Sequence, residues 1–443
     1  MGDWLRIAEL FDFEKGALQS SKCTPGEFTF ITAAEEWKTH NEFTHDCEAL
    51  IFAMGASGSL GRTHYFKGKF ISSDLCFILQ PKKHLKLDLT FYYYIFNFLR
   101  AEIVSKLAKG TSKLAINQKS FGDYKLPYFD YDHQLIFSEK LKNIGGITSE
   151  IGNEFDGQLS HLKLLRQAVL QEAVEGKLSA EWRKQHPVVK GDPQFDAVAL
   201  LKQIKDEKER LAKEGKIRKE KLLPPIVNAD KPFDLPEGWL WCRLGEVSEQ
   251  YVDCPHATPH YTSDGYICLR APNIVEGKLR FNEIRYVSAA EYEKRIQRLK
   301  PSRDDLVYIR EGGRLGIAGI IDSDEPVCLG QRLMLVRFFE STTAVLMANT
   351  LNSPQAFKGI VGKTIGAASP HVNVRDVIAY PVPLPSLAEQ QAIVDRVDSL
   401  MSVIDELEKQ VADRKEQAQM LMQTVLREAF DSDSTAQKSF LND

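Results

Sequence analysis

The sequence has little of what several classes of protein require. Its seven cysteines stand singly, without a C-x-x-C pair, which indicates reduced thiols and neither a disulfide framework nor a zinc ribbon. No apolar run is long enough to span a membrane, and the first residues, MGDWLRIAEL, lack the basic and apolar regions of a secretion signal. We therefore expect a cytoplasmic protein without a membrane segment.

Catalytic and cofactor-binding motifs are also missing. The sequence contains no H-E-x-x-H, no G-x-S-x-G and no N/D-P-P-Y/F element of an amino-methyltransferase. Gly362-Lys363-Thr364 resembles the end of a phosphate-binding loop, but Phe357 occupies the position of its first glycine. His256 and His260 have a zinc-like spacing, but no second ligand pair stands nearby in the sequence. We therefore assign no catalytic residue, no cofactor site and no metal site to this chain.

The charge balance gives no global signal for nucleic acid, because the net charge of the 443 residues is −4. Any contact with DNA must come from local basic patches. Hydrophobic residues make up 43% and charged residues 27% of the chain, which is typical of globular proteins. The length predicts roughly two to four domains.

Residues 387–430 have the pattern of a long helix that begins after Pro381, Pro383 and Pro385. Ser386 and Glu389 fit a capping box at its start. Apolar residues then recur at alternating steps of four and three, which is the seam of a coiled coil. The seam consists of Ile393, Val397, Leu400, Ile404, Leu407 and Val411, and it continues toward Val425.

The chain contains this stretch twice. Apolar residues stand 256 positions before most members of the seam, and they include Phe137, Leu141, Ile144, Ile151 and Phe155. The same offset maps Asn373, Pro383 and Gln390 onto Asn117, Pro127 and Gln134 without a gap. An ungapped match through the helix, its proline-containing entry and the preceding loop indicates internal duplication.

The globular parts repeat as well. Both halves open with a similar segment at 4–10 and 241–247, and both contain short β-like runs around a glycine loop, 55–61 or 312–319. We therefore expect an α+β chain of two tandem globular α/β domains and two long helices, packed antiparallel as a coiled coil about a pseudo-two-fold axis. The predicted parts are a first domain at 1–131, a first helix at 132–182, a charged proline-containing linker at 183–236, a second domain at 237–386, a second helix at 387–430 and a tail at 431–443.

Two stretches have more than one interpretation. The aromatic block at 89–107, with Phe91, Tyr92 and Phe96, fits a buried helix, although its rings could also stack on bases. The basic end of the linker, 216–221, could contact phosphate or form a solvated face.

At this point the sequence resembles a known family, the specificity (S) subunits of type I restriction-modification systems. The resemblance rests on the run from Gly366 to Val377 and on the PVPLPSLAEQQAIV element that follows it at 381–394. The entry LPEGWLWCRLGEV at 235–247, the loop DCPHATP at 253–259 and the linker ending KEKLLPP are also similar to the start of that family's target recognition domains. The first copy departs from the pattern, because PYFDYDHQ at 127–134 replaces the proline-leucine entry.

The resemblance implies that each globular domain is a target recognition domain that reads one half of a bipartite double-stranded DNA sequence. It also implies that the two helices set the spacing and dock methylation (M) subunits, with two copies expected. S-adenosylmethionine would then be bound by the methylation subunits, and ATP and Mg by restriction (R) subunits. This chain would be non-catalytic.

Arg and Gln can read guanine and adenine edges, and Lys more often meets phosphate. On that basis, and on positions in glycine loops and strand borders, we select candidate DNA contacts, although each could equally be a solvated surface residue. They are Arg314, Gln331, Arg332, Lys363, His256 and Thr258 in the second domain, and Ser57 and Lys67 in the first.

A different class of function also fits the layout: a coiled-coil scaffold whose two domains bind proteins or peptides. The near-neutral charge favours it, because nonspecific DNA affinity comes largely from neutralised phosphates. Salt-dependent binding to mixed DNA would distinguish a DNA-binding protein from a peptide-binding scaffold.

Overall fold

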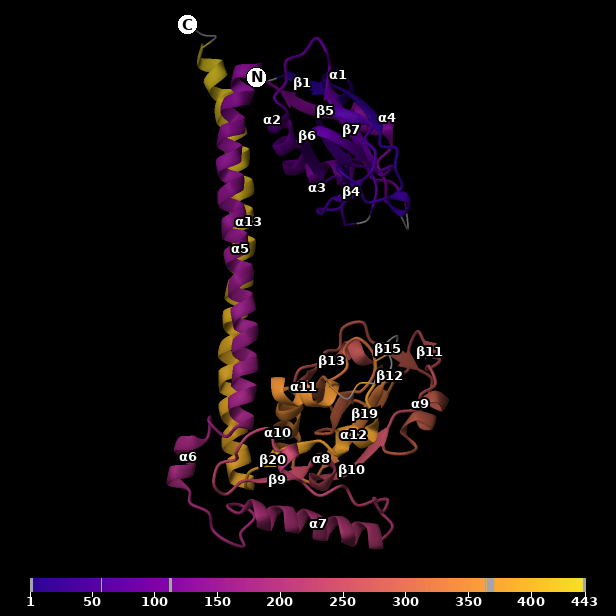
Figure 1. Ribbon diagram of the computed structural model, residues 1–443, viewed down its shortest axis with the longest axis vertical. Coiled ribbons are helices and arrows are strands. Elements are labelled where there is room, and N and C mark those ends of the chain that lie inside the picture. The colour runs from indigo at the N-terminus through magenta and orange to yellow at the C-terminus, as the bar shows by residue number, and fades with distance from the viewer. Residues whose placement is uncertain (1–2, 57, 111–113, 363, 365–369, 441–443) are drawn as a thin grey trace. The chain divides into compact units, whose positions relative to one another are not determined.

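The computed structural model describes residues 3–56, 58–110, 114–362, 364 and 370–440. Along the two long helices, the side chains of 144–145, 148–149, 422–423 and 425–440 fall outside that description. The chain divides into two compact units, which are treated separately: unit 1 comprises 1–157 and 411–443, and unit 2 comprises 158–410. Figure 1 shows the elements of each unit.

The globular part of unit 1 is built on a six-stranded sheet with the order β2-β7-β5-β6-β3-β4. The sheet strands are β2 (Phe11–Lys15), β3 (Phe28–Ile31), β4 (Lys38–His40), β5 (His45–Ala53), β6 (Thr63–Ser72) and β7 (Cys76–Pro81). A separate two-stranded ribbon pairs β1 (Asp3–Arg6) with β8 (Lys125–Tyr128). The helices are α1 (Ile7–Leu10), η1 (Ser20–Lys22), α2 (Leu89–Phe98), α3 (Arg100–Leu107) and α4 (Gln118–Asp123).

Aromatic side chains fill the core of unit 1. Phe91, Tyr92 and Phe96 of α2 are fully buried, so their predicted packing role is confirmed. Tyr92 packs edge-on against Phe11, with ring centroids 5.1 Å apart. The single helix predicted at 89–107 is broken at Leu99, whose backbone leaves the helical region between α2 and α3.

Unit 2 repeats this scaffold. Its first sheet has the order β10-β19-β16-β17, and its second sheet has the order β11-β15-β12-β18. The strands are β9 (Leu240–Arg243), β10 (Ser248–Asp253), β11 (Tyr261–Thr262), β12 (Tyr266–Leu269), β13 (Ile274–Val275), β14 (Lys278–Leu279), β15 (Arg285–Val287), β16 (Leu306–Ile309), β17 (Ala318–Ile320), β18 (Val327–Leu329), β19 (Leu333–Phe338) and β20 (Pro381–Leu384). The globular helices are α8 (Leu244–Val247), η3 (Ala271–Asn273), α9 (Ala289–Ile296), α10 (Ser341–Asn352), α11 (Pro354–Val361) and α12 (Val374–Ile378).

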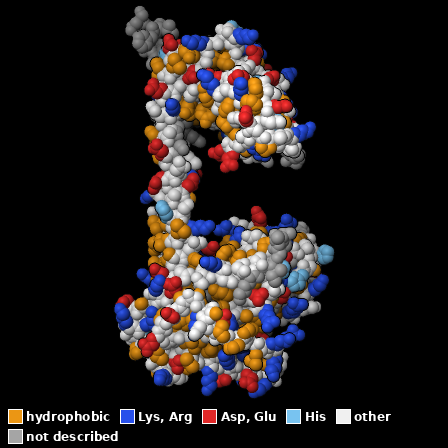
Figure 2. Space-filling model, in the orientation of Figure 1, with side chains coloured by type: hydrophobic (Ala, Val, Ile, Leu, Met, Phe, Trp, Pro, Cys, Tyr) orange, Lys and Arg blue, Asp and Glu red, His pale blue; other side chains and the backbone are white. Residues whose placement is uncertain are grey.

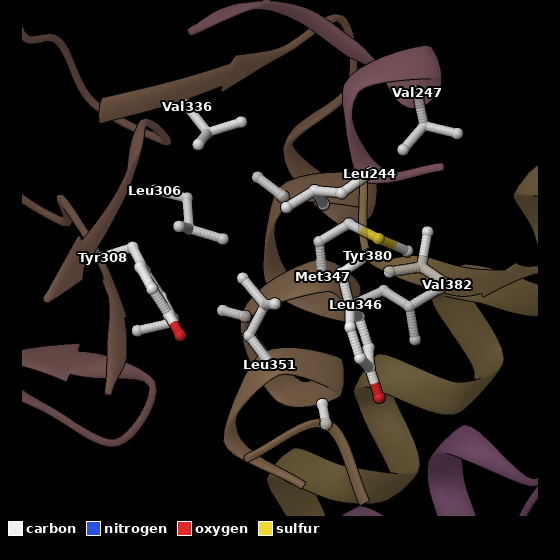
Figure 3. Packing of buried hydrophobic residues seen from close by; sticks show 14 of the residues in the cluster. Leu244, Val247, Leu306, Tyr308, Val336, Leu346, Met347, Leu351, Tyr380 and Val382 are labelled. Atoms are coloured by element: carbon white, nitrogen blue, oxygen red, sulfur yellow. The ribbon is translucent and has the colours of Figure 1, made fainter. Parts of the chain in front are cut away.

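The core of unit 2 is aliphatic. Figure 3 shows Leu306, Tyr308 and Val336 of the first sheet pointing toward Leu346 and Leu351 of α10. Each of these five residues is at most 2% exposed to solvent. At roughly 25 cal/mol per Å² of apolar surface removed from water, such burial is the main force that holds the sheet to its helix.

The strand pairing of the first copy recurs in the second, so the duplication includes the sheets. The antiparallel pair β3–β4, in which Phe28 is opposite His40, corresponds to the antiparallel pair β12–β15, in which Tyr266 is opposite Val287. The order β2-β7-β5-β6 corresponds to β10-β19-β16-β17. The second copy differs by an inserted segment between β12 and β15, which carries η3 and the hairpin β13–β14.

The two long helices are α5 (Tyr131–Val174) and α13 (Leu387–Phe440). Helix α5 ends before the predicted position, because Gly176 adopts a left-handed conformation with φ of 71°. The backbone N–H groups of Gly176 and Lys177 then bond to Ala173 and Glu172 and close a Schellman motif. Helix α13 runs beyond the predicted end at 430.

Within unit 2 the parts of α5 and α13 run in opposite directions. The Arg166 guanidinium of α5 pairs with Asp405 and Glu408 of α13, whereas Ser179, just after α5, donates to Glu389 near the start of α13 at 2.7 Å. Both helices contribute to the core of unit 2, for example through Val169 and Ile393. Within unit 1, Lys415 of α13 pairs with Asp156 of α5 at 2.6 Å.

Several predicted seam residues are placed differently from the expectation. Phe137 and Leu141 are buried against the aromatic core of unit 1, because Phe129 and Phe91 lie next to the start of α5. Ile393, Val397 and Ile404 are buried in the core of unit 2, and Leu400 packs at its margin. Ile151 and Leu407 are 37% and 39% exposed, Phe155 is half-buried, and the side chain of Ile144 lies outside the described residues. The apolar pattern therefore serves domain packing at least as much as a helix-to-helix seam.

The segment predicted as a linker is folded against the second copy. It forms α6 (Ala180–Gln185), α7 (Ala197–Lys213) and η2 (Asn228–Asp230). Leu200 and Ile204 of α7 are buried in the core of unit 2, and Figure 1 shows α7 lying along the edge of that unit next to α8. Lys216 in the basic end pairs with Glu214 at 2.8 Å.

Candidate nucleic-acid interface

The candidate residues of the second copy that the structure describes gather at one end of its first sheet. Because β10 and β16 both run antiparallel to β19, their carboxyl ends lie beside the start of β19: Asp253 is opposite Met334 and Ile309 is opposite Leu333. Three loops meet there, at 253–260, 310–317 and 330–332. We call this set of loops the loop edge.

Arg310 joins the loops of this edge. Its guanidinium donates to both carboxylate oxygens of Asp253, at 2.7 and 3.0 Å, and is only 6% exposed. The backbone of Arg310 bonds to Arg332 at 3.1 Å and to Val372 at 2.9 Å. A bidentate pair of this kind fixes geometry as well as adding energy. The ring of His256 lies 3.1 Å from the same guanidinium and is 66% exposed.

Two predicted contacts touch each other. Thr258 Oγ1 donates to Gln331 Oε1 at 2.9 Å, so these residues form one polar group on adjacent loops. Arg332 has an exposed side chain and a φ of 79°, which is uncommon for a residue with a side chain and typical of functional loops. Its guanidinium lies close to Gly312, where an added Cβ would approach Nη1 to 3.4 Å.

Arg314 lies on the same edge but is held by the inserted segment. Its Nη2 donates to the carbonyl oxygen of Ile274 at 2.9 Å. The hairpin β13–β14 packs directly on β17, since Gly277 N–H bonds to Ala318 at 2.9 Å and a Cβ at Gly319 would meet Lys278 O at 2.7 Å. The guanidinium is thus exposed and oriented, with donors left to bind a ligand.

Buried Cys254 supports the first of these loops. Its sulfur accepts from the backbone N–H of Leu333 at 3.3 Å. Burial raises the pKa of the Cys254 thiol to about 11, so the group stays protonated and unreactive at neutral pH. The loop edge therefore offers Arg, Gln, Thr and His donors and acceptors, while its cysteine thiol is buried and protonated. Figure 2 shows Lys and Arg side chains interspersed with Asp and Glu over the visible surface of unit 2.

The first copy has the same edge with other residues. Met54 stands where the second copy has Arg310, since Ile116 N–H bonds to Met54 O as Val372 N–H bonds to Arg310 O. Lys15 stands where the second copy has Asp253, since Lys15 is opposite Phe77 in the first sheet as Asp253 is opposite Met334 in the second. Lys67 lies in the middle of β6, away from this edge, and pairs with Glu48 of β5 at 3.5 Å. Ser57 and Lys363 lie outside the described residues.

The sequence did not identify Arg310 or Asp253 as the pair that organises the edge. A signal was present: Asp253 opens the DCPHATP loop and Arg310 directly follows a buried strand. Among the residues that the structure describes, no group of three or more His, Cys, Asp or Glu side chains is placed to hold a metal ion. Within the same described residues, no helix has the length and apolar character of a membrane span.

Comparison with known proteins decides the family. The model of the type I restriction modification DNA specificity domain matches residues 1–155 and 236–416. The chain belongs to this family. The two matches coincide with the two copies, so the family's domain occurs twice here.

Curated relatives agree with this assignment. The chain is 28% identical to the EcoAI type I restriction enzyme specificity subunit of Escherichia coli over 304 residues, which cover 66% of this chain and about half (49%) of that relative. It is 24% identical to the EcoDI specificity subunit of E. coli over 98% of this chain and 89% of that relative. It is 26% identical to the EcoKI specificity subunit of E. coli strain K12, over 88% and 75% of the two chains.

A solved structure shares the fold. A chain in a structure described as the structural basis of complex assembly and conformational transition of the type I restriction-modification system aligns over 97% of both chains. The TM-score is 0.51 at 16% identity. At that identity the likeness concerns the architecture alone.

Proposed function

We propose that this chain is the DNA specificity subunit of a type I restriction-modification complex, in which each globular domain reads one half of a bipartite double-stranded DNA target. The observation that supports it most directly is the loop edge of the second copy. It presents Arg314, Gln331 and Arg332, residue types that read base edges, on a scaffold that the first copy repeats with different residues.

The two long helices act as a spacer in this proposal. A helix of 44 residues such as α5 is roughly 65 Å long, which is enough to hold two reading domains on separate parts of a duplex. An antiparallel coiled coil between α5 and α13 would place one domain at each end. Exposed apolar side chains on these helices, such as Leu164 at 61% and Val403 at 57%, would dock methylation subunits, two in number.

The partners carry the chemistry. We assign S-adenosylmethionine to the methylation subunits, and ATP and Mg to restriction subunits, in the cytoplasm. This chain acts as a non-catalytic subunit that selects the sequence and assembles the complex.

A binding and methylation experiment tests the proposal. The purified chain is titrated with mixed-sequence and target DNA over a series of salt concentrations, with and without its methylation subunit, and methylated positions are then mapped in cells that carry both. We expect affinity to fall steeply with salt and methylation to occur at one bipartite sequence. Salt-independent binding, or methylation without a bipartite sequence, would refute the proposal.

A further inference from the structure

The duplication allows the surface of one copy to be compared with its counterpart in the other. The ribbon β9–β20 and helix α8 of the second copy correspond to β1–β8 and α1 of the first. The backbone N–H of Leu244 bonds to Tyr380 O at 3.0 Å, and that of Ile7 bonds to Tyr124 O at 2.9 Å. The cap is also repeated, since the N–H groups of Arg243 and Arg6 each donate to the glutamate three residues on, at 2.8 Å.

In the second copy this surface is covered. Helix α7 inserts Leu200 and Ile204 into the core beside it, Lys208 Nζ donates to the carbonyl oxygen of Gly245 at 2.7 Å, and Lys205 pairs with Glu246 at 2.7 Å. Arg243 is then only 7% exposed and donates to the carbonyl oxygens of Pro224 and Pro225. Gly245 is buried.

In the first copy the same surface is exposed. Arg6 is 51% exposed and pairs with Glu9 alone among the described contacts, against the multiple partners of Arg243. Trp4 is 58% exposed, whereas its counterpart Trp241 is half-buried. Ala8, the counterpart of Gly245, is exposed. We call Trp4, Arg6, Ala8 and Glu9 the α1 face.

We propose that the α1 face is a docking surface for an amphipathic helix of the methylation subunit, which lies on the first copy as α7 lies on the second. This inference rests on the proposed function, because it takes the helix from that partner. The second copy supplies the pattern of the occupant: two apolar residues four apart, then lysines one and four positions later, as in Leu200, Ile204, Lys205 and Lys208. The acceptors for those lysines, a glutamate carboxylate and the carbonyl oxygen before it, are retained at Glu9 and Ala8.

The two copies differ where the segment after α7 packs. A Cβ at Gly245 would lie 2.9 Å from Leu223 Cδ1, so with Ala8 in that place a leucine of the occupant would have to turn its side chain aside. The proposed occupant is therefore defined by its likeness to α7 alone. An exposed tryptophan beside such a surface is typical of residues that contribute most to binding interfaces.

The test compares two variants of the face with a matched control. Trp4→Glu and Ala8→Arg alter the α1 face. The control, Ala101→Arg, adds the same positive charge as Ala8→Arg but places it on exposed α3 of the same unit. We expect the dissociation constant for the methylation subunit to rise about tenfold or more in the two face variants and to stay within twofold in the control. Hydrogen exchange of the wild-type chain should slow at residues 4–10 and 125–128 when the methylation subunit is added.

Each outcome separates this inference from the function on which it rests. If the wild-type complex forms and methylates its target while exchange at the face is unchanged and both variants bind normally, the α1 face is not the docking surface. If the face becomes protected as the concentration of this chain alone is raised, a second copy occupies it and the methylation subunit is the wrong partner. If no methylation subunit binds the wild-type chain, the proposed function itself fails.

Discussion

Gln134 and Gln390 make the same hydrogen bond at equivalent places in the two copies. Each donates its Nε2 to the carbonyl oxygen five residues earlier, Phe129 O at 2.6 Å and Pro385 O at 3.1 Å, and each is fully buried. Their Oε1 atoms accept from different groups, Asp88 N–H and Thr343 Oγ1. The bond therefore ties the start of each long helix to the residue that follows the preceding strand, β8 or β20.

Removing either glutamine should destabilise its own copy. Gln134→Ala and Gln390→Ala each leave buried polar groups without a partner, at a cost of about 1–3 kcal/mol. Chemical denaturation measures the loss, with Gln410→Ala, which alters an exposed side chain of α13, as the control. Equal stability of the buried and exposed variants would contradict the structural role.

The Arg310–Asp253 pair should behave as one unit. Arg310→Met leaves the half-buried Asp253 carboxylate without its guanidinium and should cost about 3 kcal/mol. The double variant that adds Asp253→Ala removes both charges, and it should cost less than the sum of the single variants by about 1–3 kcal/mol. Additive losses in a double-mutant cycle would show that the two side chains are independent.

Replacing glycine by alanine should have opposite effects on stability inside α5 and just after it. Gly152 lies inside the helix with open space around a Cβ, so Gly152→Ala should stabilise by about 1 kcal/mol. Gly176 has a φ of 71°, and a Cβ there would meet Pro236 at 2.7 Å, so Gly176→Ala should lower stability. Thermal unfolding of both variants checks the pair, and the same sign of change in both would be evidence against these helix bounds.

Arg314 should contribute to sequence choice. Arg314→Ala should weaken target binding and reduce discrimination at one base position by about 1–3 kcal/mol. Arg303→Ala is the control, because Arg303 precedes β16 and so lies at the opposite end of that strand, paired with Asp324 at 2.9 Å. Unchanged affinity and unchanged target choice in the Arg314 variant would remove it from the candidate contacts.

Target content and target spacing should be separable. One heptad inserted after Phe155 and one after Val411 keep the apolar pattern of both helices in phase and lengthen each by about 10 Å. We expect the same two half-sites with roughly three more base pairs between them. DNA binding is measured before methylation, because the insertion also alters the surface that we propose for docking the methylation subunits. A change of base preference with an unchanged gap would refute the spacer model.

The sequence predicted the parts of the fold that depend on local pattern. Proline-containing entries, the long helices and the offset that relates Gln134 to Gln390 are all visible as periodicity and repetition. The early end of α5 was also readable, because a glycine such as Gly176 commonly ends a helix. The break at Leu99 carries no comparable signal, since neither glycine nor proline stands there.

Long-range contacts could not be predicted in the same way. The charged composition of α7 indicated a linker, but Leu200 and Ile204 decide its position by packing into a core formed from other parts of the chain. Arg310 is one of many arginines in the sequence, and only the pairing of β10 and β16 with β19 brings it to Asp253. Apolar residues of the long helices pack either on a globular domain or on the other helix. Which of the two a residue such as Phe137 contacts likewise depends on residues distant in sequence.

The ribbons β1–β8 and β9–β20 bring the two ends of each globular domain together, which bears on how genes of this kind can recombine. Each globular domain begins on one strand of a ribbon and ends on the other, with Trp4 opposite Pro127 and Trp241 opposite Pro383. The two ends of a domain are thus about 4.8 Å apart, joined by backbone hydrogen bonds that do not depend on side-chain identity. Recombination at these two strands could replace a whole domain and leave the helices, and whatever assembles on them, as they were.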